Sequence, residues 1–197
     1  MTSADLLRIS YEKSEVVQKT MTSSPSRLFL TTAILAATLA ASVPAAASFY
    51  EDAFREAANG GVACYARSYD AAHLRANPKQ RVAFIALKVS SRKADGSTNR
   101  PGDFEATLGL SARSGKDLYI KSAYCKPDRN AARCGLESDG GEIRLQAGND
   151  GSLRIDTAGG EIRIEGARDF LEVGGRLSDD NVFRLSRAQA NACAGLE

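Results

Sequence analysis

The chain has 197 residues, and its 26 lysine and arginine residues nearly balance its 24 aspartate and glutamate residues, which leaves a formal net charge of +2. Hydrophobic residues make up 43% of the sequence, as in ordinary globular proteins, so wholesale disorder is not expected. The weak net charge argues against nucleic acid as a partner, and the single histidine argues against histidine-rich metal sites.

Residues 21–47 have the three parts of a secretory signal peptide. Arg27 lies in a short polar segment, an uncharged apolar run follows it, and Pro44 precedes the small-residue pair Ala45 and Ala47. Export requires an apolar helical segment, and the signal peptidase accepts only small side chains at its cleavage site. We therefore predict cleavage after about Ala47 and a periplasmic or secreted location for the rest of the chain.

Residues 1–20 do not fit a signal peptide, because they are long and carry balanced charges. The simplest interpretation is that Met21 is the true start of the protein. The alternative is a cytoplasmic tail on an uncleaved anchor, since the segment 28–47 has the length of a membrane span. Its alanine-rich composition and its proline favour cleavage, after which no stable membrane insertion is expected.

The four cysteines Cys64, Cys125, Cys134 and Cys193 all lie in the predicted mature chain, 48–197. An even number of cysteines in an exported chain indicates disulfides, because that compartment is oxidising. Four cysteines allow three pairings, and chain proximity favours Cys125 with Cys134 and Cys64 with Cys193. On the chain-entropy model, the long loop closed by Cys64–Cys193 contributes about 4–5 kcal/mol to stability, and the short loop closed by Cys125–Cys134 contributes about 3 kcal/mol. No C-x-x-C motif or Cys/His cluster occurs, so neither a metal nor a cofactor is expected.

The mature chain begins with a helical pattern and then changes to strands. Apolar residues recur at helical spacing over 49–58, and a glycine pair ends the run. A strand is predicted over 62–69, and the short segment 70–78 is expected to form a helical turn or a loop. The most apolar strand, 81–91, has apolar residues on both faces, which indicates a central position covered on both sides.

Most of the remaining segments alternate between apolar and polar residues, the pattern of strands with one buried face. In chain order these strands are predicted over 104–112, 118–125, 142–147, 152–157, 161–166, 170–173 and 182–185. Turns that contain glycine separate the strands of the second half, as in a meander of hairpins. About eight or nine strands at this spacing predict a mainly β domain, either an antiparallel sandwich or a small barrel, with a short N-terminal helix.

Two groups of titratable side chains are candidates for catalysis, and each has a simpler structural interpretation. His73 follows Asp70 and could act as a general base, but no nucleophile motif accompanies it, so a structural loop histidine is favoured. Asp179 and Asp180 could form half of a cation site or a carboxylate pair. Adjacent residues of a strand face opposite ways, however, and ordinary turn chemistry explains them as well.

An arginine stripe and the strand aromatic residues suggest two kinds of ligand site. Arg144, Arg154 and Arg163 could together bind an anion, but their acidic neighbours favour cross-strand ion pairs. The aromatic residues are core residues by default, and in a large enough barrel they could instead line a cavity for a small ligand.

No catalytic residue is therefore predicted, and the expected function is non-enzymatic binding of an envelope protein or surface component. A β scaffold commonly presents function on its loops, and the polar segments 92–102 and 126–133 are the candidate contact loops, the first of them expected to be mobile. The second is positively charged, with Lys126, Arg129 and Arg133 against Asp128, and a disulfide across its base would lower the entropic cost of binding. The alternatives are a lipocalin-like carrier of a small ligand and a hydrolase that uses the single histidine.

Overall fold

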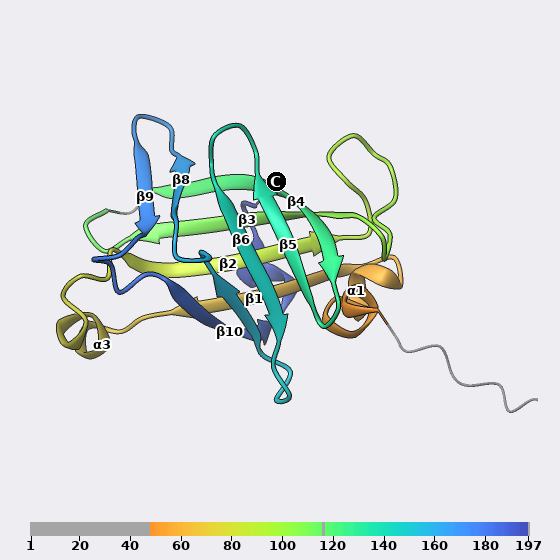
Figure 1. Ribbon diagram of the computed structural model, residues 1–197, viewed down its shortest axis with the longest axis horizontal. Coiled ribbons are helices and arrows are strands. Elements are labelled where there is room, and N and C mark those ends of the chain that lie inside the picture. Colours follow the sequence, from red (N-terminus) through yellow and green to blue (C-terminus); the bar gives the residue numbers. More distant parts are fainter. Residues whose placement is uncertain (1–47, 116, 197) are drawn as a thin grey trace, which may run out of the picture. The chain divides into compact units, whose positions relative to one another are not determined.

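The computed structural model describes residues 48–115 and 117–196, so the predicted leader segments 1–20 and 21–47 lie outside the described residues. All described residues belong to one compact unit of the chain. Its central feature is a closed antiparallel barrel of eight strands (Figure 1). The predicted mainly β fold class is thus confirmed, and of the two predicted architectures the chain adopts the barrel.

Apart from β5 (Ala131–Leu136), which was not predicted, the barrel strands lie close to the predicted positions. In chain order they are β1 (Val62–Ser68), β2 (Val82–Ser90), β3 (Phe104–Ala112), β4 (Leu118–Asp128), β5 (Ala131–Leu136), β6 (Glu142–Ala147), β7 (Leu153–Asp156) and β10 (Val182–Ala188). Strands that follow one another in the chain are neighbours in the barrel, and β10 closes it by pairing with both β7 and β1. The two other strands, β8 (Glu161–Glu165) and β9 (Phe170–Gly174), form a separate hairpin.

Two short helices precede the barrel. A capping box starts α1 (Phe49–Ala53): the Ser48 side chain accepts from the Glu51 backbone N–H, and the Glu51 carboxylate accepts from the Ser48 backbone N–H at 3.0 Å. The chain then breaks at Phe54 before α2 (Arg55–Ala58), whereas the sequence pattern predicted one continuous helix.

The helical segment lies at one end of the barrel (Figure 1), and its aromatic side chains belong to the buried core cluster. The rings of Phe49, Tyr50 and Phe54 lie with their centroids 5.1–6.5 Å from that of Phe104 on β3. Phe54 also packs edge-on against Tyr65 on β1, with centroids 6.0 Å apart. Aromatic rings bury large areas and prefer such tilted or edge-to-face contacts. The helices are therefore attached to the barrel mainly through its core.

The interior of the barrel is the hydrophobic core of the protein. Inward-facing side chains of all eight strands form one buried cluster, which four apolar residues of the β8–β9 hairpin join: Ile162, Ile164, Leu171 and Val173. Eight strands leave an interior just wide enough for side chains to fill. The core thus occupies the space that an internally bound ligand would need.

The C-terminal tail covers the outer face of β2. A disulfide joins Cys64 on β1 to Cys193 at the end of the 3₁₀ helix η1 (Ala190–Cys193), and Leu196 then packs over Gly109 of β3. A Cβ atom at position 109 would lie 2.2 Å from Leu196 Cδ2, so only glycine leaves room for the tail. Cys64, Ala86, Cys193 and Leu196 form a second buried cluster outside the barrel. This cover explains why β2 is apolar on both faces.

Candidate functional site

The predicted loop 126–133 is in fact the end of a hairpin. β4 continues to Asp128 and β5 begins at Ala131, so the turn between them contains only Arg129 and Asn130. The φ angle of Arg129 is +56°, the left-handed conformation that a two-residue hairpin turn requires. The prediction of a loop was wrong here because polar residues also suit the outward face of a strand.

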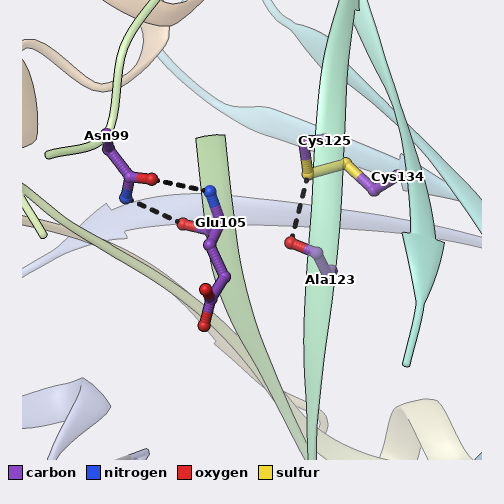
Figure 2. The surroundings of a disulfide bond; sticks show 5 residues. All are labelled: Asn99, Glu105, Ala123, Cys125 and Cys134. Carbon is purple, nitrogen blue, oxygen red and sulfur yellow. Dashed lines mark hydrogen bonds between the residues drawn. A yellow bond between two sulfur atoms is a disulfide. The ribbon is translucent and has the colours of Figure 1, made fainter. Parts of the chain in front are cut away.

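A disulfide clamps this hairpin from its inner face (Figure 2). Cys125 and Cys134 lie directly opposite each other in the β4–β5 register, with their Cα atoms 4.0 Å apart, and both are buried. Cys125 Sγ lies 3.7 Å from the carbonyl oxygen of Ala123. Together with Cys64–Cys193, this is the pairing that chain proximity favours. The clamp holds the outer face of the hairpin in one register.

On that outer face, four residues form one straight row across four strands. Glu105 of β3 lies opposite Tyr124 of β4, Tyr124 lies opposite Gly135 of β5, and Gly135 lies opposite Glu142 of β6. Tyr124 is 55% exposed. A Cβ atom built on Gly135 would meet nothing within 4 Å, so the position beside the tyrosine ring is empty. The row therefore presents an aromatic ring next to a hollow, which we call the Tyr124–Gly135 hollow.

The hollow is part of a surface cavity of about 380 Å³. Its lining consists of Tyr124, Lys126, Pro127, Asp128, Arg133, Gly135 and Glu142. Two of the three predicted contact residues, Lys126 and Arg133, thus line one cavity and lie opposite each other in the register. The third, Arg129, lies in the turn and does not line it.

The charges of this cavity are balanced, although the segment was predicted to be positively charged. Arg133 Nε lies 3.3 Å from Asp128 Oδ2, and Arg133 Nη1 lies 3.8 Å from Glu142 Oε1. Arg144 on the next strand also approaches Asp128, at 3.9 Å. All these side chains are partly exposed, so each ion pair contributes little stability but orients the groups it joins.

The Tyr124 hydroxyl stays protonated at neutral pH. Partial burial raises the pKa of this phenol, and the negative charges of Glu105, Glu137 and Asp95 raise it further. The group therefore acts as a neutral hydrogen-bond donor and acceptor beside the hollow.

The other predicted contact loop, 92–102, is tied to the same face. Asn99 is buried and donates hydrogen bonds to the carbonyl oxygens of Ser90 (2.8 Å) and Glu105 (3.1 Å). Its side-chain oxygen accepts from the Glu105 backbone N–H at 2.8 Å (Figure 2). The Asn99 side chain thus joins the backbone of Ser90 at the end of β2 to the backbone of Glu105 on β3. These bonds hold the loop 92–102 next to the row that contains Tyr124.

This loop borders a second cavity of about 470 Å³ on the outer face of β2, β3 and β4. Lys88, Thr107 and Ser122 also line it, and they lie opposite one another on the three strands. Lys121, whose side chain is 5% exposed, also lines it and lies 3.3 Å from the Glu165 carboxylate. The cavity is therefore polar, with hydroxyl groups and with charges of both signs.

His73 lies away from this face, in the short helix α3 (Ala71–Ala76). Asp70 caps the helix by accepting a hydrogen bond from the His73 backbone N–H at 2.7 Å. The imidazole stacks on the Tyr69 ring with centroids 4.7 Å apart, and its Nε2 lies 2.9 Å from Gln80 Oε1. The imidazole therefore has a stacking partner and an amide partner, in a helix rather than in a loop, and it lines a cavity of about 240 Å³.

Asp179 and Asp180 fasten the turn before β10 to the start of β2. Asp179 Oδ2 accepts from the Lys79 backbone N–H at 3.1 Å, and Asp180 Oδ2 accepts from the Arg81 N–H at 2.5 Å. Asp180 is fully buried, and among the described residues its Oδ1 has no hydrogen-bond partner. Burial raises the pKa of this carboxyl group, and the nearby Asp179 charge raises it further.

The three arginines of the predicted stripe do not form one anion site. Arg144 approaches Asp128, and Arg154 Nη2 lies 2.8 Å from Asp156 Oδ2. Arg163 belongs to the separate β8–β9 hairpin, where its guanidinium lies 3.6 Å from the centroid of the Phe170 ring. Each arginine therefore has its own local partner.

Within 48–115 and 117–196, no group of three or more His, Cys, Asp and Glu side chains is placed to hold a metal ion. Comparisons with models of protein families, with curated proteins and with solved structures found no match. The site is therefore interpreted from its own geometry.

Tyr124 was expected, like the other strand aromatic residues, to be a core residue by default, but it is 55% exposed. Its pairing with Gly135 was missed, although a signal for that pairing exists. A disulfide between directly opposite residues of antiparallel strands fixes the register of its neighbours. The residue before Cys125 must then face the residue after Cys134, which pairs Tyr124 with Gly135. Reading the segment as a loop concealed this relation.

Proposed function

We propose that the protein is a non-enzymatic recognition protein of the cell envelope that binds its partner through the outer face of β3–β6. The observation that carries this proposal is an exposed tyrosine beside an empty glycine position on a disulfide-clamped hairpin. Tyrosine is enriched where proteins bind partners, and binding energy concentrates on such anchors. A clamped hairpin loses little conformational entropy on binding.

An extracytoplasmic location agrees with the covalent structure. Two disulfides and no free cysteine occur in the described part of the chain, and disulfides persist in oxidising compartments. No helix of that part is long and apolar enough to cross a membrane. The two disulfides support the export that the sequence of residues 21–47 predicts.

The alternative functions have less support. A carrier would have to displace the aromatic cluster and the apolar side chains that fill the barrel. The outer face requires no such rearrangement, because its hollow is already open. A hydrolase that uses His73 has no evident nucleophile, because the described residues that line the cavity of about 240 Å³ at this histidine include no serine, threonine or cysteine.

Filling the hollow tests the proposal. The variant Gly135→Leu places a side chain beside Tyr124, and the barrel should still form because nothing lies within 4 Å of the new Cβ atom. We expect capture of a specific component from an envelope extract to fall at least about tenfold, a loss of about 1.4 kcal/mol. Tyr124→Ala should have the same effect.

Two matched variants are the controls. Gly160→Leu adds the same side chain at a glycine before β8, and Leu177→Ala removes a side chain that is 82% exposed. Both should capture the component as the wild type does. Unchanged capture by Gly135→Leu and Tyr124→Ala would refute the assignment of the binding face.

A further inference from the structure

We propose that the Tyr124–Gly135 hollow binds a neutral sugar unit of an envelope glycan. This inference rests on the proposed function and names its class of ligand. It follows from the charges of the cavity, from the shape of the hollow and from the second cavity next to it.

The charges of the cavity favour a neutral ligand over an ion. Lys126 and Arg133 are balanced by Asp128 and Glu142, and Arg133 contacts both carboxylates. A cationic group would have to displace Arg133 from the two carboxylates, and an anionic group would meet those carboxylates beside Lys126 and Arg133. A hydroxyl group both donates and accepts, so it can bind the carboxylates and the guanidinium while their ion pairs persist.

The shape of the hollow suits a flat ring with C–H bonds on one face. The exposed Tyr124 side chain forms one side of the hollow. Because Gly135 has no side chain, the space next to Tyr124 is unoccupied. The face of an aromatic ring is apolar and carries partial negative charge, which attracts the weakly positive C–H face of a pyranose. The cavity volume of about 380 Å³ lies in the usual range for small-molecule sites.

The second cavity indicates that the ligand is longer than one sugar. Its lining includes Glu105, which lies opposite Tyr124, and Ser122, which lies two residues before Tyr124 on the same face. Tyr124 therefore stands at the border between the two cavities. The hydroxyls of Thr107 and Ser122 and the ammonium group of Lys88 line the second one. An oligosaccharide that crosses Tyr124 could thus place one ring in each cavity.

The test uses three neutral trisaccharides, triacetylchitotriose, cellotriose and maltotriose, and measures their Kd by calorimetry. At least one should bind to the wild type, and Gly160→Leu should bind it equally. Tyr124→Phe keeps the stacking face and should change the Kd by no more than about threefold, since it loses one neutral hydrogen bond. Tyr124→Leu and Gly135→Leu should weaken binding about tenfold or more. Because the ligand is neutral, adding salt should leave the Kd nearly unchanged.

The inference is overturned if none of the three trisaccharides binds, or if Gly135→Leu binds them as the wild type does. It is also overturned if a charged peptide binds instead, with an affinity that needs Tyr124 and falls with salt. In each of these cases, the proposed function is retained if Gly135→Leu still reduces capture of the component from the envelope extract. Capture that is independent of Gly135 would remove the proposed function itself.

Discussion

At the scale of single residues, the missing side chain of Gly135 matters more for the candidate site than any charge around it. The sequence analysis chose Lys126, Arg129 and Arg133 for their charge, yet Asp128 and Glu142 already accompany Arg133. Exposed ion pairs of this kind are worth about 0–1 kcal/mol. The exposed ring of Tyr124 and the space beside it are the features that a ligand can use.

Asp180 permits a prediction of pH dependence. Burial raises the pKa of this carboxyl group in the folded protein above its usual value of 3.8, so folding favours the protonated form. Its contribution to the free energy of unfolding is therefore full at low pH and is lost as the pH rises through the folded-state pKa. In Asp180→Asn this titration is absent, whereas the carboxylates with lowered pKa values, such as Asp70, remain.

Urea denaturation of both proteins between about pH 3.5 and pH 8 measures the effect. The free energy of unfolding of the wild type minus that of Asp180→Asn should fall with rising pH and then level off. A difference that rises with pH would show that the folded protein prefers the charged carboxylate.

At the scale of elements, alternating polarity predicted the positions of most strands but not their partners. The hairpin over 161–174 was expected to continue a meander, whereas β8 and β9 pair only with each other. The periodicity of hydrophobic residues identifies the buried face of a strand, but it does not show which strand lies beside it. Hydrogen bonds between segments about 100 residues apart, such as that between Asp180 and Arg81, leave no local pattern either.

The candidate site was predictable only in part, because some of the contacts that form it also leave no local pattern in the sequence. Lys126 and Arg133 were found because they lie between two cysteines in a polar segment. The anchoring of the loop 92–102 by Asn99 was not found, since an asparagine in a polar loop looks like ordinary turn chemistry.

The two disulfides should differ in their effect on stability. Cys64 and Cys193 are 129 residues apart, and Cys125 and Cys134 are 9 residues apart. On the chain-entropy model, changing the first pair to alanine should lower the free energy of unfolding by about 5 kcal/mol and changing the second by about 3 kcal/mol. Urea denaturation of the two double variants measures these losses, and a larger loss for the short closure would contradict the entropic explanation.

At the scale of the whole molecule, the choice between barrel and sandwich depends on a single long-range pairing. β10 pairs with β1, with Cys64 opposite Ala188, and this closes the sheet on itself. No local pattern could show that closure. The apolar outer face of β2, by contrast, correctly predicted a cover, which the C-terminal tail provides. Because the interior is filled, the proposed binding site lies on the outer surface.

A titration followed by NMR tests the location of the binding face most directly. The isotope-labelled protein would receive the envelope component that the wild type captures, and amide shifts would be mapped onto the barrel. We predict that the largest shifts lie along the row of Glu105, Tyr124, Gly135 and Glu142. Shifts centred on His73, or on the interior rings of Tyr50 and Phe54, would contradict this account and would favour a hydrolase or a carrier.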